Sequence, residues 1–477
     1  MSASSNAAFD RSRLDRNTLE EIVEIAGDPA RLAAFDAAGE SCSWCAEPVR
    51  LSGGVTAVDV GTGEVVQLAG GPGRVYFKAC GSRRATRCPA CAERYRMDAR
   101  MIVLAGLRGG KGVPEEIAGH PAVFATLTAP SFGAVHRART RDGRRLTCRD
   151  GGAARCPHGR SRRCATAHRE NDACVGEPLC VDCYDYERQV LFNALAPELW
   201  RRTTIYARRV LARGAGLRER ELRGVARLSF VKVAEYQRRG VVHLHVVARL
   251  DPVDEGELPP GLDTGALVAA LATAARQVRV SYPGGFAGEA RFGDQLVIDV
   301  LERGDDDRAA RSVAGYLGKY ATKGSDENGA LDRRVRSRHD PALGRLSAHL
   351  RRLVETAWRL HARPGLEGLG LRRFAHALGF RGHWMTKSRR WSTTFANLRL
   401  ERAAWVAAKR EESGGELTEL GDARRAALVE VRAQWRYEGR GWETGGEAHL
   451  AARRDEERRE TMRSVRELAT TTLGRAA

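Results

Sequence analysis

Long apolar runs are missing from this sequence of 477 residues. No run of about 18 apolar residues occurs, so we expect no membrane span. The amino-terminal stretch MSASSNAAFDRSRLDRN has no apolar centre, so it does not fit a secretory signal peptide. These absences predict a cytoplasmic protein whose cysteines stay reduced and are available as metal ligands.

A nucleotide-binding phosphate loop is also missing. Residues 106–113, GLRGGKGV, are rich in glycine, but the spacing G-x4-G-K-[ST] fails because position 105 is Ala and position 112 is Gly. The sequence therefore offers no motor of the helicase class. It also contains no internal repeat.

Lysine is scarce, because only seven of the 79 basic residues are Lys and the others are Arg. A GC-rich genome favours arginine codons, so part of the net charge of +19 reflects composition rather than a binding surface. A pI of about 9.9 still suits a polyanionic partner, and nucleic acid is the first expectation.

The excess charge is concentrated in residues 331–410, which contain 19 Lys and Arg against five Asp and Glu. There the stretch RRFAHALGFRGHWMTKSRRWSTT mixes basic, hydroxyl and aromatic side chains, which suits phosphate contacts and base stacking on Trp384 or Trp391. A solvated basic face is the alternative. The predicted DNA contacts are Lys323, Arg381, Lys387, Arg389 and Arg390.

Eleven cysteines are present, several of them in C-x2-C pairs. The first two pairs, Cys42/Cys45 and Cys88/Cys91, predict a structural zinc site that holds a small domain together, and Cys80 is left over. Four reduced, buried thiols are the alternative interpretation.

A second group of possible zinc ligands falls in residues 145–183. Its members are Cys148, Cys156, His158, Cys164, His168, Cys174, Cys180 and Cys183. The favoured set is Cys156, Cys164, Cys180 and Cys183, with His158 and His168 as substitutes or as ligands of another ion. The whole chain would then bind one to three structural Zn²⁺ ions and present arginines such as Arg160 and Arg162 to DNA.

Periodicity predicts the order β, α, β, β, α, β, α for the middle of the chain. The expected elements are strands at 123–132 and 295–302, a hairpin of 224–236 and 240–251 around QRRG, and helices at 186–213 (broken near Pro197), 264–278 and 307–324 (closed by Gly324). This order indicates an α+β fold with one antiparallel sheet and helices on one face, close to a split βαβ or ferredoxin-like arrangement.

A pair of histidines, His243 and His245, lies in the second strand of the predicted hairpin. Residues two apart on a strand face the same side, so both imidazoles can share one divalent ion. If the turn spans 238–240, Glu235 lies opposite His243 on that face and supplies a carboxylate ligand. Two ordinary strand histidines on a solvated face are the alternative.

A helix with two tyrosines follows. GYLGKYATKG places Tyr316 and Tyr320 four residues apart on one helix face, beside Lys319 and Lys323. A phenol is a nucleophile once a nearby cation helps it lose its proton, and the lysines would hold phosphate oxygens. An aromatic helix face packed on the sheet is the alternative.

Taken together, FATLT, HLHVV and YLGKY resemble, in order and spacing, the three motifs of the HUH endonucleases that initiate rolling-circle replication. Further stretches, among them CPHGRSRRC, GEPLCVDCYDY and GHWMTKSRRWSTT, resemble the replication initiators of actinobacterial integrative and conjugative plasmids. This resemblance covers about residues 40–410.

The resemblance implies a plasmid replication initiator that nicks and rejoins single-stranded origin DNA through a 5′-phosphotyrosine. It implies a catalytic Mg²⁺ or Mn²⁺ held by His243, His245 and Glu235, with Tyr316 as main nucleophile, Tyr320 as second nucleophile and Lys319 at the phosphate. Because no motor is visible, a host helicase and polymerase would be partners. The alternatives are a relaxase or transposase with the same site, or a zinc-finger DNA-binding regulator without activity.

The expected organisation has five parts. They are a helical lead-in at 1–38, a zinc-binding domain at 39–115, an HUH nuclease domain at 120–325 with the Cys/His insertion 145–183, a basic helical DNA-binding region at 340–412 and a charged helical tail at 413–477.

Overall fold

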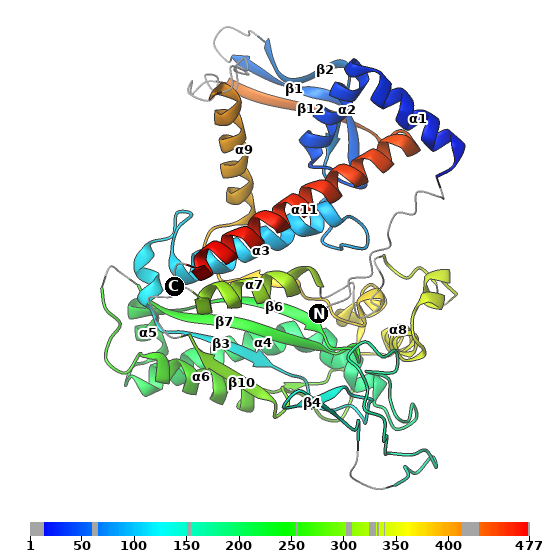
Figure 1. Cartoon of the computed structure of the whole chain (residues 1–477). Helices are drawn as coiled ribbons and strands as arrows, with labels where there is room; N and C mark the ends of the chain where they lie inside the picture. The colour runs from blue at the N-terminus through cyan, green and yellow to red at the C-terminus, as the bar shows by residue number, and fades with distance from the viewer. Residues whose placement is uncertain are drawn as a thin grey trace. The chain divides into compact units, whose positions relative to one another are not determined.

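The computed structural model describes residues 14–475 apart from 60–64, 150–153, 254–255, 302–307, 324–330, 332, 338 and 413–428. The chain divides into two compact units (Figure 1). The terminal unit combines Met1–Tyr95 with Arg399–Ala477, and the central unit is Arg96–Leu398. This division differs from the five expected parts, because both ends of the chain build one unit and the boundaries lie within helices α3 (Pro89–Arg108) and α9 (Phe395–Glu412).

The terminal unit is built on a three-stranded antiparallel sheet of order β12-β1-β2. Its strands are β1 (Val49–Asp59), β2 (Val65–Lys78) and β12 (Val429–Arg440), and its helices are α1 (Arg16–Gly27), α2 (Pro29–Cys42) and α11 (Gly445–Arg475). The prediction that the chain is helical from residue 340 onward is wrong for β12. The stretch VEVRAQWRY alternates apolar and polar residues, a strand period that its high charge obscured.

A small aromatic core joins the two ends of the chain within the terminal unit. Trp442, which follows β12, stacks on Phe77 at a centroid distance of 5.2 Å and lies 5.3 Å from Phe35. Its indole nitrogen donates to the carbonyl oxygen of Cys45 at 3.0 Å. The carboxy-terminal segment therefore packs directly on the first cysteine group.

The central unit contains a five-stranded antiparallel sheet of order β10-β3-β7-β6-β11. Its strands are β3 (Ala122–Leu127), β6 (Ala226–Tyr236), β7 (Val242–Pro252), β10 (Leu296–Val300) and β11 (Met385–Lys387). The predicted hairpin and flanking strands are thus confirmed, and so is the α+β class. The short strand β11, from the basic region expected to be helical, pairs with β6 at one edge.

Helices cover both faces of this sheet, which corrects the expectation of helices on one face (Figure 1). The helices α4 (Tyr186–Gly214) and α6 (Thr264–Gln277) share a large apolar core with Leu244 of β7. On the opposite face, α7 (Arg308–Lys323) packs on β6. Gly324, expected to end α7, lies outside the described residues.

The expected break at Pro197 does not occur. Helix α4, 29 residues long in all, continues through Pro197 to Gly214. Proline removes one helical hydrogen bond, but burial of much of the α4 surface against the sheet outweighs that local loss. The remaining elements of the central unit are α5 (Glu219–Val225), α8 (Ala348–His361), β4 (Arg139–Arg141), β5 (Arg144–Leu146), β8 (Val280–Ser281), β9 (Glu289–Ala290) and the short 3-10 helices at Glu115–Gly119, Pro341–Arg345, Glu367–Leu369 and Ala375–Ala377.

Membrane-spanning segments were not expected, and within the described ranges no helix is both long and apolar enough to cross a bilayer.

Candidate active site and metal centres

The hairpin β6–β7 brings Glu235 and His243 directly opposite each other in the strand register. Gln237 and Gly240 form the turn, in which Gly240 N donates to Gln237 O at 2.8 Å. Gly240 has φ +73°, and an added Cβ would lie 2.8 Å from Leu378, so both the backbone conformation and the space require glycine here. The turn thereby fixes the register that the sequence predicted.

A buried asparagine on α4 holds this turn. The Asn193 amide donates to Gly240 O at 2.9 Å and to Leu378 O at 2.9 Å, and its oxygen accepts from Val242 N at 3.0 Å. Sequence reasoning missed Asn193, whose one sign is a polar residue in the apolar run LFNAL. It is a positioning residue, because a shift of one residue in the hairpin would turn His243 to the other face.

Three potential ligand atoms converge on the face of the sheet that α7 covers. His243 Nε2 lies 2.7 Å from His245 Nε2, and Glu235 Oε2 lies 3.3 Å and 3.1 Å from these nitrogens. Leu244, between the histidines, points into the core on the other face. Two imidazoles and one carboxylate are a common ligand set for a divalent ion that keeps open positions. The residues therefore fit a catalytic Mg²⁺ or Mn²⁺.

Contacts with strand β3 fix the orientation of His245. Its Nδ1 lies 3.2 Å from Thr126 Oγ1 on the neighbouring strand β3, and its ring stacks on Phe124 with an interplanar angle of 8°. Burial lowers the pKa of His245, so the neutral imidazole needed for metal ligation is favoured. For Glu235, burial raises the pKa, but hydrogen bonds with His243 and His245 outweigh it and leave the pKa lowered.

Loss of the hydroxyl at position 126 should weaken this support. We expect Thr126→Val to reduce Mn²⁺ affinity by about 10- to 100-fold, because partners behind a ligating histidine fix its tautomer and orientation. Isothermal titration calorimetry with Mn²⁺ would measure the change, with Thr140→Val in β4 as the matched control. Unchanged affinity in Thr126→Val would contradict the assigned role.

The two predicted tyrosines both lie at this site. Tyr316 Oη is 3.4 Å from His245 Nε2, and the Tyr320 ring is 5.4 Å from the His245 ring and 4.4 Å from the Tyr316 ring. Tyr316 is 39% exposed, so a substrate can reach it. Burial, together with the Tyr320 and Glu235 charges, raises the pKa of Tyr316.

A glycine between the tyrosines lets α7 pack closely against α3. A Cβ on Gly318 would lie 3.1 Å from Arg96 O and from Arg100 Cβ of α3. Lys319 is exposed, with its Nζ 5.6 Å from the centre of the Tyr320 ring. The Lys323 side chain lies outside what the structure describes, so its predicted DNA contact stays a prediction.

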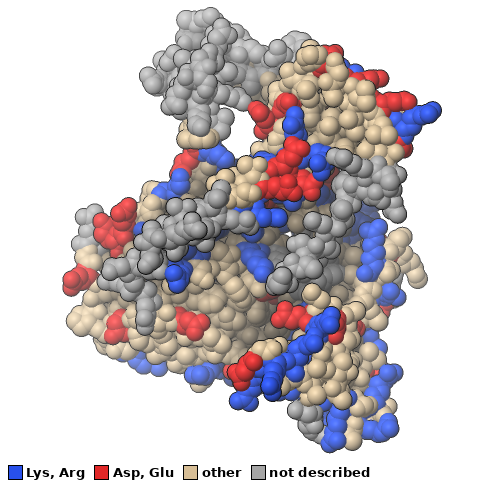
Figure 2. Space-filling model, viewed as in Figure 1, with Lys and Arg blue, Asp and Glu red and all other residues tan. Residues whose placement is uncertain are grey.

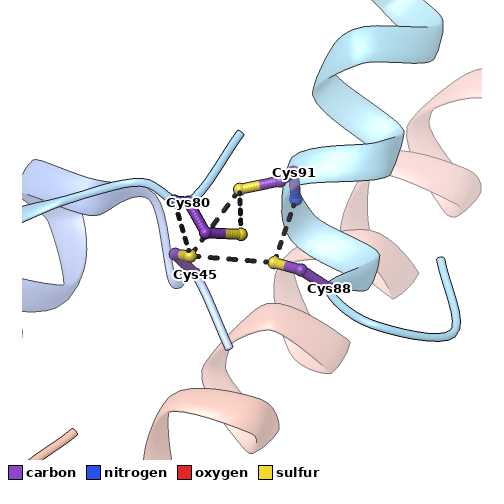
Figure 3. Close-up of side chains that lie close together, drawn as sticks. All are labelled: Cys45, Cys80, Cys88 and Cys91. Atoms are coloured by element: carbon purple, nitrogen blue, oxygen red, sulfur yellow. Dashed lines mark hydrogen bonds between the residues drawn. The ribbon is translucent and has the colours of Figure 1, made fainter. Parts of the chain in front are cut away.

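The first cysteine cluster contains Cys45, Cys80, Cys88 and Cys91 (Figure 3). Three sulfur pairs, Cys45–Cys88, Cys45–Cys91 and Cys80–Cys91, are 3.7–3.8 Å apart. A tetrahedral zinc with Zn–S bonds of about 2.3 Å places its sulfurs about 3.8 Å apart, so the geometry fits.

The predicted ligand Cys42 is not part of this cluster. Its thiol instead contacts the carbonyl oxygen of Gly39 at 3.5 Å, and burial raises its pKa. The left-over Cys80 takes its place, because Cys42 ends helix α2 and Cys80 follows β2 on the side of the other three sulfurs.

The second group, for which one or two ions were left open, forms two clusters. Cys156, His158, Cys180 and Cys183 come together, with His158 Nδ1 3.2 Å from Cys183 Sγ. Of the favoured set, Cys164 is therefore replaced by His158. Both clusters could hold zinc.

Cys164 belongs to the other cluster, with His136, Cys148 and His168. His168 Nε2 lies 3.2 Å from His136 Nδ1 and 3.3 Å from Cys164 Sγ, while His168 Nδ1 faces Asp172 at 3.4 Å. A carboxylate behind a ligating histidine is typical of zinc sites. Sequence reasoning missed His136, because it lies outside the Cys/His-rich stretch.

Basic side chains surround these clusters. Figure 2 shows Lys and Arg gathered over the lower right of the molecule, where Figure 1 places β4 and the loops beside it. Arg160 and Arg162 of the insertion are exposed. Their predicted contact with DNA stays a prediction.

The predicted DNA contacts of the basic region fall into two groups. Arg381, Arg389 and Arg390 are exposed, whereas Lys387 is half-buried and its ammonium donates to Ser392 O at 2.8 Å. Trp391 cannot stack on a base, because it is fully buried and donates to Ile102 O at 3.2 Å. Trp384 packs on Tyr236 at 4.9 Å.

Comparison with known proteins shows the family of the chain. The family model for the replication initiator protein of pSAM2 matches residues 31–456. The chain belongs to this replication initiator family. A replication initiator protein of Streptomyces ambofaciens is 39% identical over 458 residues, which cover 92% of this chain and 93% of that protein. No solved structure matches the chain. As a family member, the chain is a plasmid replication initiator.

Proposed function

We propose that this initiator is an HUH-type endonuclease and strand transferase that nicks single-stranded plasmid origin DNA and starts rolling-circle replication. The observation that carries the proposal is the position of the Tyr316 hydroxyl, 3.4 Å from His245 in the Glu235–His243–His245 cluster. A phenol beside a carboxylate and two imidazoles that could hold a divalent ion suits the attack of tyrosine on a phosphate.

In the proposed reaction, Tyr316 Oη attacks the scissile phosphorus and forms a phosphotyrosine bond with the 5′ phosphate. The P–O3′ bond breaks, and the released 3′ oxygen takes up a proton and serves as a primer. A Mg²⁺ or Mn²⁺ ion bound by Glu235, His243 and His245 would polarise the phosphate and stabilise the leaving oxygen. The ester conserves the energy of the broken bond, so joining needs no ATP.

The other groups have supporting roles in this proposal. Lys319, exposed beside the tyrosines, would bind phosphate oxygens. Tyr320, with its ring 4.4 Å from that of Tyr316, would act on a second strand at termination. The three cysteine and histidine clusters would bind Zn²⁺ and hold the terminal unit and the insertion in shape.

Mass spectrometry can test the proposal directly. After incubation with a single-stranded origin oligonucleotide and Mn²⁺, we expect an oligonucleotide attached to the peptide that contains Tyr316, and none when EDTA replaces the metal. Absence of any covalent product with both tyrosines intact would contradict the proposal and favour a DNA-binding regulator without nuclease activity. A replication assay with the adjacent origin in a host would distinguish an initiator from a relaxase.

A further inference from the structure

A basic pocket of about 850 Å³ lies in the central unit and shares no residue with the tyrosine site. Its walls carry five arginines, Arg333, Arg334, Arg336, Arg372 and Arg373, together with His361. Arg372 and Arg373 begin the stretch that the sequence predicted to contact phosphate, but none of the six residues was among the individually predicted DNA contacts. The volume is in the range of pockets that bind small ligands or parts of larger ones.

One wall is a loop held by buried anchors. Leu331 and Val335 insert into the main apolar core, so the arginines between and beside them point outward. Asp340 is buried and accepts from both terminal nitrogens of Arg333, at 2.7 and 2.5 Å, and from the backbone N–H of Arg336 at 3.2 Å. These contacts hold the Arg333 side chain and the backbone at Arg336 in place before any ligand binds.

The other wall follows α8 and carries the pair Arg372 and Arg373. The Arg372 guanidinium lies 4.4 Å over the Trp358 ring, and the Arg373 guanidinium lies 5.5 Å from the Phe374 ring. Stacking fixes the plane of a guanidinium and leaves its N–H edge available for a phosphate. Both arginines are exposed to solvent.

The pocket has excess positive charge. Arg333 is balanced by Asp340, but within the described part of the chain no carboxylate oxygen is recorded within 4.0 Å of Arg334, Arg372 or Arg373. Guanidinium groups gathered without counter-charges favour an anionic ligand with several negative charges. The rings beside the pocket are covered by arginines, so the site is suited to phosphates rather than to stacking of bases.

We propose that this arginine pocket binds the phosphate backbone of duplex DNA beside the origin nick. The identification of the duplex as origin DNA rests on the proposed function. The expectation that the pocket binds phosphates rests on its arginines alone. Helix α8 connects the pocket with the turn of the β6–β7 hairpin, whose strands carry the metal-ligand candidates. Near the start of α8, His349 Nε2 lies 3.0 Å from Arg239 O in that turn, and His361 at the end of α8 lines the pocket. A helix of 14 residues spans about 21 Å, so the pocket lies about that far along α8 from the β6–β7 turn.

Salt-dependent DNA binding of the full chain tests the proposal. The variant R334A/R372A/R373A would be titrated against a labelled mixed-sequence duplex of about 40 base pairs, without divalent metal, at about 50–300 mM NaCl. Each lost phosphate contact removes about 0.9 from the slope of log Kd against log salt. We expect the slope to fall by about 2.7 and binding to weaken by about 100-fold near 0.15 M salt.

Two controls separate pocket contacts from net charge and from misfolding. The control variant R201A/R209A/R223A removes the same charge from α4 and α5, where these arginines form ion pairs with Glu198 and Glu219. We expect it to keep most of the salt dependence of DNA binding. R334K/R372K/R373K keeps the charges and should retain the slope. Equal losses in both alanine triples, or an unchanged slope in the pocket triple, would overturn the proposal, and so would pocket-triple and control-triple slopes that cannot be told apart. The assay needs no cleavage, so it stays informative if nicking through Tyr316 is disproved.

Discussion

Tyr316→Phe should abolish the covalent protein–DNA product. The substitution removes the oxygen that lies 3.4 Å from His245 Nε2 and leaves the ring that packs on Phe124 and His245. Because the proposal assigns the first strand to Tyr316 and only the second strand to Tyr320, we expect the rate of adduct formation to fall by more than about 10³-fold. A denaturing gel of the protein with a single-stranded origin oligonucleotide and Mn²⁺ would show the loss of the shifted band.

Two further tyrosine variants sharpen this test. Tyr206→Phe, on α4 at the opposite face of the sheet, controls for loss of a phenol and should keep the adduct. Tyr320→Phe should still form the first adduct but fail to transfer it to a second strand. A full-strength band in Tyr316→Phe would assign the nucleophile to Tyr320 or disprove the tyrosine mechanism altogether.

Cys88→Ser should unfold the terminal unit. Cys88 is fully buried, with its sulfur 3.8 Å from that of Cys45, and the cluster lies against the small core around Trp442. Structural zinc binding contributes about 10–16 kcal/mol in small zinc modules, far more than an aromatic core of this size can supply. We expect one bound zinc fewer by native mass spectrometry and an early, separate unfolding transition by calorimetry.

The neighbouring Cys42 provides a matched control. It is equally buried, but its thiol contacts the Gly39 carbonyl oxygen and lies outside the cluster. Cys42→Ser should therefore keep the zinc content and cost only about 1–3 kcal/mol of stability, the effect of a polar group in a tight core. Equal zinc loss in the two variants would contradict the assignment of Cys80 as the fourth ligand.

The site around the histidines was predictable because it depends on local rules. Alternation along β7 places His243 and His245 on one face, and the short turn sets Glu235 opposite His243. Helical spacing does the same for Tyr316 and Tyr320. Each of these inferences needs only neighbouring residues in the sequence or one hairpin register.

The zinc clusters were predictable only in part, because their ligands come from separate segments. The C-x2-C spacing identified Cys88/Cys91 and Cys180/Cys183 correctly as neighbours in a cluster. It could not show that Cys80, rather than Cys42, joins Cys88 and Cys91 in the first cluster. It also could not show that His136 lies in the same cluster as Cys164. Those choices depend on where the β1–β2 hairpin places Cys80 and where the loop after β5 places Cys164. Neither position is encoded by a local sequence pattern.

The sheet of the terminal unit determines when that unit can fold. Strand β12 pairs along the whole length of β1, although more than 360 residues separate them. A ribosome delivers the amino-terminal segment first, so β1 lacks its partner strand β12 until residues 429–440 emerge. The central unit, made of continuous sequence, can fold during that delay. The central unit, with the tyrosine site, would then be assembled before the terminal unit that encloses it in the sequence is complete.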